Sequence, residues 1–188
     1  MSIGIKEQST RVRALREQHA RTRHSALTTV LGNVRLLLIA IWLGAAVFFS
    51  FAVAPSAFDV LPTRDLAGAV VGRTLAIVNV GGFIVSLLML MSAPVARVAT
   101  GKRAFVVEVS VLAVLAISTA VNYWIITRRI EGVRRMMNRP IEEVALGDPL
   151  RIAFSNLHLF SVVLLTTGIV AAAVALLLVA RRTYRRSS

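Results

Sequence analysis

An uncharged run of 23 residues, 36–58, constrains the fold of this chain more than any other feature. As a helix it would rise about 35 Å at about 1.5 Å per residue, enough to cross a bilayer core of about 30 Å. Three further uncharged blocks follow at 74–96, 109–127 and 152–180. Each of the four blocks reaches the roughly 18 residues typical of a membrane-spanning helix. The sequence therefore predicts an all-α fold, a polytopic membrane protein with four transmembrane helices in a bundle.

The apolar blocks divide the chain into one membrane domain and two basic tails. We expect a basic cytoplasmic tail at residues 1–34, disordered or forming an amphipathic surface helix, and a basic C-terminal tail at 182–188. The four-helix membrane domain, residues 35–181, is predicted to hold helices at about 33–54, 66–91, 105–128 and 149–181. Pro55 and Pro94 are expected to end the first two helices. Asn138 with Pro140 predicts a short surface helix in the last loop, and Asp148 with Pro149 predicts the start of the fourth helix.

The charge distribution indicates how the chain sits in a membrane. A net charge of +13 on a soluble protein would indicate a nucleic-acid partner. Here the charges lie at the ends of apolar blocks, so we expect contact with anionic lipid headgroups and no nucleic acid. With four helices, 14 Lys and Arg residues fall on the side of the two tails and 8 on the other side. This asymmetry predicts a multi-pass protein of the bacterial inner (cytoplasmic) membrane with both termini inside.

Polar side chains gather near the predicted helix ends that face away from the tails. They are Asp59, Arg73, Asn79, Asn122, Ser155, His158 and Ser161. In a single bundle these side chains could line a vestibule on the outer face that accepts a small polar or anionic ligand. The alternative is the ordinary polarity of helix ends, with Arg73 paired to Asp59 or Asp65.

Two ionisable residues in or beside the apolar blocks are candidates for chemistry. His158 is the only histidine within a block, where it could ligate haem or a metal, carry a proton, or form a structural hydrogen bond near the outer interface. Glu108 lies about one turn inside Arg103 at the inner end of the third helix. It is either a proton or cation site or an interfacial ion pair with Lys102 or Arg103. We expect the ion pair of Glu108 with Arg103, and no bound cofactor or metal.

Small residues form faces on the first two predicted helices. Ala40 and Gly44 are four residues apart and give a groove that another helix can approach. On the second helix one face is small and polar, so it should pack against protein rather than lipid; its residues are Gly68, Gly72, Asn79, Gly82 and Ser86. These faces favour a homo-oligomer or a complex with a membrane protein partner.

The sequence lacks the usual signatures of an enzyme. It contains no phosphate-binding loop, dinucleotide-binding motif, zinc-protease motif or nucleophile elbow. We therefore expect a small accessory or structural membrane protein that oligomerises or binds a partner, and no enzyme. One alternative is a transporter or channel subunit for a small polar or anionic solute. A second alternative is a haem- or quinone-associated membrane protein that uses His158.

Several short motifs resemble a known family. They are Trp42-Leu43-Gly44 with Val47-Phe48-Phe49, Ala54-Pro55-x-x-Phe58, Ala67-Gly68-x-Val70-Val71-Gly72, and Asp148-Pro149-Leu150-Arg151 followed by Phe154-x-x-Leu157-His158-x-x-Ser161. Together they resemble the bacterial transmembrane-protein-205-like family of domain-of-unknown-function membrane proteins, over about residues 33–180. The resemblance implies a four-helix membrane domain of no assigned activity. One departure is that the family's fourth helix usually carries an Asn soon after the Ser, and residues 162–165 contain none.

Overall fold

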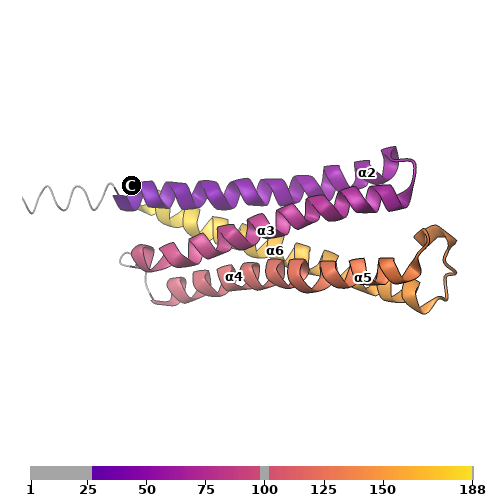
Figure 1. Ribbon diagram of the computed structural model, residues 1–188. Coiled ribbons are helices and arrows are strands. Elements are labelled where there is room, and N and C mark those ends of the chain that lie inside the picture. The colour runs from indigo at the N-terminus through magenta and orange to yellow at the C-terminus, as the bar shows by residue number, and fades with distance from the viewer. Residues whose placement is uncertain (1–26, 98–101, 188) are drawn as a thin grey trace, which may run out of the picture.

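The computed structural model describes residues 27–97 and 102–187, whose helices form one elongated bundle (Figure 1). Four helices are long and apolar enough to cross a membrane: Leu27–Val60, Arg64–Pro94, Lys102–Met137 and Pro149–Arg182. The predicted all-α fold with four such helices is confirmed. Of the predicted tail at 1–34, residues 1–26 lie outside the described part of the chain.

The first helix passes through Pro55 instead of ending before it. The π-helical segment η1 (Phe49–Val53) precedes α2 (Ala54–Val60), and Pro55 stands in the first turn of α2. The amide of Ala54 donates to the carbonyl of Phe49, five residues back. Proline removes a backbone donor and crowds the carbonyl four residues before it, and a wider π turn is one way for a helix to absorb both effects. The predicted end at residue 54 is therefore six residues too early.

The second and third spans also run further than predicted. Helix α3 (Arg64–Arg97) contains Pro94 in its interior. The third span joins α4 (Lys102–Val121), the π-helical η2 (Asn122–Thr127) and α5 (Arg128–Met137) into one continuous helix. Within η2 the hydroxyl of Thr127 donates a hydrogen bond to the Asn122 carbonyl at 2.9 Å.

The short surface helix predicted after Asn138 is confirmed only in part. Asn138 ends α5 in the left-handed conformation, with φ 47°, which asparagine tolerates better than most residues. Only a single 3-10 turn, η3 (Ile141–Glu143), follows it. Sequence reasoning ended the helix too soon because α5 carries many charges. Its apolar residues Val133 and Met137 are nevertheless buried in a small second core whose partly buried members include Leu150 and Phe154.

The last helix, α6 (Pro149–Ser187), begins as predicted. The Asp148 carboxylate accepts a hydrogen bond from the Leu150 amide at 2.8 Å, and Pro149 opens the first turn. The helix continues through residues 182–187, which were predicted to form a basic tail. All four spans are therefore about 45–55 Å long at about 1.5 Å per residue, longer than a bilayer core is thick.

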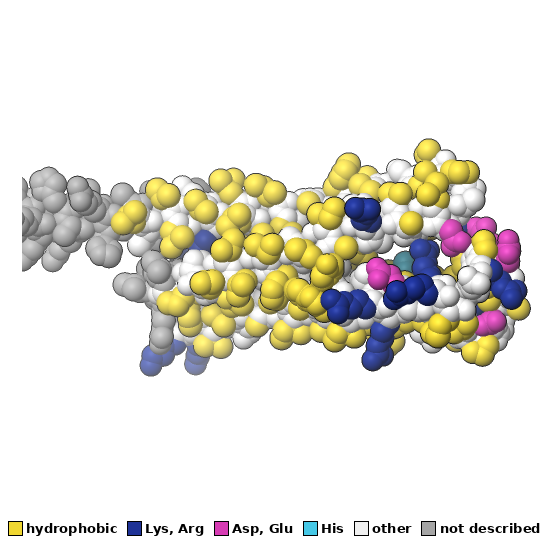
Figure 2. Space-filling view, viewed as in Figure 1, with side chains coloured by type: hydrophobic (Ala, Val, Ile, Leu, Met, Phe, Trp, Pro, Cys, Tyr) yellow, Lys and Arg dark blue, Asp and Glu magenta, His cyan; other side chains and the backbone are white. Residues whose placement is uncertain are grey.

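The main core lies in the half of the bundle nearer the α3–α4 connection. Its buried residues come from all four spans and include Ile39, Trp42, Met89, Leu112, Leu115, Ala172 and Ala175. In the other half, the hairpin of α2 and α3 diverges from the hairpin of α5 and α6 (Figure 1). Figure 2 shows a hollow between these two hairpins, with charged side chains around it. We call the half that contains the α3–α4 connection the inner half and the half with the diverging hairpins the outer half.

Candidate functional site

A buried ionic cluster closes the inner half of the bundle. Glu108 of α4 is 1% exposed, and one of its carboxylate oxygens lies 2.5 Å from Nη2 of Arg35 on the first helix. Its other oxygen accepts from Nη1 of Arg182 on α6, and Nη2 of Arg182 also donates to the Ala104 carbonyl at 2.9 Å. One carboxylate therefore ties three of the four spans together.

The predicted ion pair between Glu108 and Arg103 is wrong in its partner. Arg103 is exposed, and none of the ion pairs among the described residues joins it to Glu108. The two residues are five apart, which places them roughly 140° from each other around a helix with 3.6 residues per turn. Glu108 consequently faces the bundle and finds its cations on other helices.

Two arginines share one carboxylate in the part of the cluster that the structure describes. Two guanidinium groups share the Glu108 carboxylate, and Nε and Nη1 of Arg35 are buried without a hydrogen-bond partner among the described residues. Removing one partner from a buried ion pair typically costs about 3–5 kcal/mol, because the charge left behind is uncompensated. The cluster is therefore a point where loss of a single side chain should affect the whole bundle.

Trp42 fills the centre of the bundle. Its indole N–H donates to the Val78 carbonyl of α3 at 2.8 Å, and 5% of the residue is exposed. A Cβ added at Gly82 would lie 2.7 Å from the indole ring, and one added at Gly168 of α6 would lie 3.7 Å from it. Glycine at Gly82 is therefore required for the ring to fit.

The predicted small and polar face of α3 is confirmed as a packing face at most of its positions. Ser86 and Asn79 are 0% and 1% exposed, and Gly82 is buried against Trp42. Gly68, nearer the loop, lies against the guanidinium of Arg134. At Gly72 an added Cβ would meet nothing within 4 Å, so this position faces open space.

Near the middle of the bundle, Asn122 and Ser161 join the third span to α6. Nδ2 of Asn122 donates to the Ser161 carbonyl at 3.2 Å, and the Ser161 hydroxyl donates to Oδ1 of Asn122 at 2.8 Å. Both residues are buried. Their polar atoms satisfy each other where water is excluded, which makes this pair an interhelical link rather than a vacant site.

Asn79 is different, because neither atom of its side-chain amide has a partner. The residue is 1% exposed, and its Oδ1 and Nδ2 make no hydrogen bond to the described residues. A buried amide without a partner costs free energy, so such groups in proteins usually bind a water molecule or another polar group. Asn79 is therefore the clearest candidate in the middle of the bundle for holding a polar molecule.

The predicted outer cluster separates into two groups. Asn79, Asn122 and Ser161 are buried in the bundle, whereas the remaining four members are exposed: Asp59, Arg73, Ser155 and His158. No ion pair among the described residues contains Asp59 or Arg73. Asp65, the other acid considered for Arg73, lies instead beside Arg134.

His158 stacks on an aromatic ring at the surface. Its ring centroid is 6.3 Å from that of Phe154, and the two planes are 5° apart. Within residues 27–97 and 102–187, no group of three or more His, Cys, Asp and Glu side chains is placed to hold a metal ion. A metal ion held by three or more side chains at His158 would therefore need ligands from outside the described residues.

Arg134 is a contact residue that sequence reasoning missed. Its Nη2 lies 3.8 Å from a carboxylate oxygen of Asp65, and its Cζ lies 5.5 Å from the ring centroid of Phe154. With its close approach to Gly68, the side chain bridges α5, α6 and the start of α3. In the sequence Arg134 is one of several arginines in a mixed-charge stretch that was interpreted as a loop, so no signal distinguished it.

These features define a multi-pass membrane protein built as a four-helix bundle with polar links between its spans. The chain belongs to the family described as "Domain of unknown function (DUF4149)", whose model matches residues 37–139, more than half of the chain. No curated protein and no solved structure matches the chain. The matched region ends before α6, yet Glu108 and Asn122 within it both depend on α6 for partners.

Proposed function

We propose that this chain is an accessory or structural protein of the bacterial inner membrane that binds a partner helix and is not an enzyme. The observation that carries the proposal is the orientation of the small-residue groove on the first helix. Ala40 and Gly44 are exposed, and a Cβ added at Gly44 would meet nothing within 4 Å. The groove predicted to receive another helix therefore receives none from the described part of this chain.

Helix association in lipid favours such a surface. Apolar side chains gain little by leaving lipid for another helix, so close backbone approach over small residues supplies much of the packing energy. Trp42, on the opposite side of the same helix, already anchors it to α3. The first helix can thus offer its outward groove to a partner without loosening its own bundle.

The inner half of the bundle argues for a static role over transport. There the four spans meet in an apolar core, and the Arg35–Glu108–Arg182 cluster lies at its inner end. A conducting path through Asn79 and Asn122 would have to cross this packed region.

The outer hollow and the unpartnered amide of Asn79 favour one second candidate function, in which a small polar solute binds from the outer side without crossing the membrane.

The placement in the membrane is also a proposal. The excess of Lys and Arg on the tail side supports an orientation with both termini inside. The motifs around Trp42 and Pro149 support a relation to the bacterial transmembrane-protein-205-like family, whose members have no assigned activity. This relation agrees with an accessory role and adds no substrate.

Cysteine crosslinking in native membranes tests the partner-binding role. The chain has no cysteine, so Gly44→Cys introduces a single reporter in the groove. Ile77→Cys is the matched control, because Ile77 is 70% exposed on α3. The two positions lie at a similar depth in the bundle, because Val78, next to Ile77, accepts a hydrogen bond from Trp42, two residues before Gly44. After mild oxidation we expect a disulfide-linked species for Gly44→Cys only. A band at twice the chain mass identifies a second copy as the partner, and another discrete mass identifies a different protein. Equal crosslinking at both positions would refute the proposal. Because a disulfide needs a thiol on each protein, absence of a crosslink at Gly44→Cys would exclude a second copy as the partner.

A further inference from the structure

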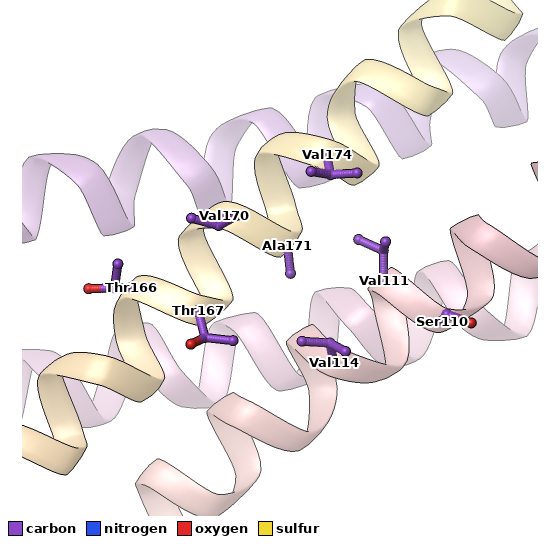
Figure 3. A pocket seen from close by; sticks show the side chains of 8 residues that line it. All are labelled: Ser110, Val111, Val114, Thr166, Thr167, Val170, Ala171 and Val174. Atoms are coloured by element: carbon purple, nitrogen blue, oxygen red, sulfur yellow. The ribbon is translucent and has the colours of Figure 1, made fainter.

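An open apolar groove runs between α4 and α6 on the outside of the bundle. It encloses about 420 Å³. In Figure 3, Val111 and Val114 of α4 point toward α6, and Thr167 and Ala171 of α6 point toward α4. Val170 and Val174 complete its wall on α6. Five of its eight lining residues are valine or alanine, and the other three are serine or threonine, so in a membrane the groove will hold hydrocarbon rather than water.

The groove occupies the inner half of the bundle. On α6 its lining extends from Thr166 to Val174, which is about 12 Å along the helix axis. Thr166 is also close to the middle of the Pro149–Arg182 span. The groove therefore runs from about the middle of the bilayer toward the tail side, across most of one leaflet's hydrocarbon layer of about 15 Å.

Each wall of the groove leads to an exposed arginine. Arg181 lies seven residues beyond Val174 on α6, and Arg103 lies seven residues before Ser110 on α4. Seven residues are close to two helical turns, so each arginine is on the same helix face as the groove and about 10 Å further toward the tail side. Both are exposed, and no ion pair among the described residues includes either. Glu108, the nearest acid along α4, is already shared by Arg35 and Arg182.

We propose that this surface binds one anionic phospholipid of the tail-side leaflet. An acyl chain lies in the groove, and the phosphate lies between the guanidinium groups of Arg103 and Arg181. The distance from Thr166 to Arg181, about 22 Å along the helix, matches the path from the middle of a bilayer to its headgroups. Guanidinium groups present paired N–H donors that suit phosphate oxygens. The site needs only the fold and is independent of the partner-binding role.

A lipid suits the groove better than the helix of another protein. Helices that pack closely in membranes meet over small residues, but this groove is lined mainly by the branched side chains of valine and threonine. The cations at its end also match a headgroup and would be unfavourable beside a second copy of the same basic surface.

Native mass spectrometry of the purified full-length chain tests the headgroup contact. The protein is mixed with equal amounts of phosphatidylglycerol and phosphatidylcholine that carry the same acyl chains, and the bound lipids are counted. We expect retained phosphatidylglycerol on the wild type. The double variant Arg103→Gln, Arg181→Gln should lose roughly fivefold in affinity per arginine, because each cation near an anionic surface contributes about that much. Arg103→Lys with Arg181→Lys should keep most of the binding.

A matched control separates this site from general charge attraction. Arg128→Gln with Arg129→Gln removes the same charge from two exposed arginines of α5 in the outer half, and should leave phosphatidylglycerol retention unchanged.

The acyl-chain contact is tested by Val114→Phe with Val170→Phe, which fills the groove without changing charge. Val162→Phe with Val163→Phe adds the same bulk at exposed positions of α6 outside the groove.

Three results would overturn the lipid site. The first is unchanged phosphatidylglycerol retention in the Arg103 and Arg181 double glutamine variant. The second is equal loss in both glutamine double variants, which would indicate non-specific attraction. The third is a dimer that disappears only when the groove is filled, which would assign the groove to a second copy. Circular dichroism and size-exclusion profiles confirm that each variant is folded before its lipids are counted.

Discussion

The indole ring of Trp42 occupies the space that any side chain at Gly82 would need. An added Cβ would lie 2.7 Å from Cε2 and Cζ2 of the ring, closer than carbon atoms approach without repulsion. Trp42 cannot simply turn away, because its N–H is bonded to the Val78 carbonyl on the same helix as Gly82. The Trp42 ring and the absence of a side chain at Gly82 therefore fix the axial register between the first helix and α3.

Gly82→Ala should destabilise the bundle by about 1–3 kcal/mol, the usual cost of overpacking a filled core. The expected result is a melting temperature in detergent that is several degrees lower, together with a shift in tryptophan fluorescence as the ring moves. Gly72→Ala is the matched control on the same face, since an added Cβ meets nothing there. It should be neutral or slightly stabilising, because alanine favours helix more than glycine does. Equal melting temperatures for the two variants would contradict the packing described for Trp42.

Glu108→Gln should be among the most damaging single substitutions in the chain. It leaves the buried Arg35 guanidinium without the carboxylate that neutralises it, a change that typically costs about 3–5 kcal/mol. Thermal unfolding in detergent measures the loss, and Glu131→Gln, at an exposed acid of α5, should change little. The double variant Glu108→Gln, Arg182→Gln should lose less than the sum of its single variants, because each single variant already removes the ion pair between these two side chains. Additive losses would mean that the two side chains do not interact.

The sequence predicted the four spans because long uncharged blocks are a strong signal, one that depends on no tertiary contact. It also predicted that the face of α3 containing Asn79 and Gly82 would pack on protein. The helix ends were the weak part of the prediction. Prolines such as Pro55 and Pro94 and a run of charges such as that of α5 are typical helix stops, yet each is accommodated within a continuous helix.

The partners within the candidate sites could not be predicted. The predicted boundaries place Arg35 at the first residue of the membrane domain and Arg182 in the C-terminal tail. Helix periodicity can place Glu108 on one face of α4, but it does not indicate which cation lies opposite. The opposing residue depends on the vertical register of three spans, which is set by contacts such as Trp42 with Gly82. Register is a tertiary property, so pairs of residues more than 70 positions apart leave no local trace in one sequence.

Asn79 and Asn122 are two buried asparagines that should respond oppositely to the same substitution. Asn122→Leu breaks two hydrogen bonds with Ser161 and leaves polar atoms of α6 unpaired, so it should destabilise by about 1–2 kcal/mol. Asn79→Leu replaces an amide that has no partner in the described residues, so it should be neutral or stabilising. Melting temperatures in detergent compare the two. A clear loss of stability for Asn79→Leu would instead indicate a polar molecule bound at Asn79.

Arg134→Gln should loosen the outer half while leaving the inner half intact. The side chain contacts Asp65 of α3 and the Phe154 ring of α6, so its loss removes a bridge between the two diverging hairpins. Hydrogen–deuterium exchange should become faster in peptides covering the start of α3 and the start of α6. Arg135→Gln removes an exposed arginine from the next position and serves as the control. The same exchange pattern in both variants would show that charge, and not this bridge, holds the hairpins together.

The proposed orientation makes a prediction about two positions at opposite ends of the bundle. Gly147 is exposed in the connection between α5 and α6, with nothing within 4 Å of an added Cβ, and Lys102 is exposed at the start of α4. Because the chain has no native cysteine, Gly147→Cys and Lys102→Cys each give one reactive thiol. If both termini are inside, a membrane-impermeant maleimide added to intact cells should label Gly147→Cys and not Lys102→Cys, and permeabilised cells should label both. The reverse pattern would mean that the 14 cations of the tail side face outward, against the usual retention of Lys and Arg in the cytoplasm. The phospholipid proposed at Arg103 and Arg181 would then belong to the outer leaflet.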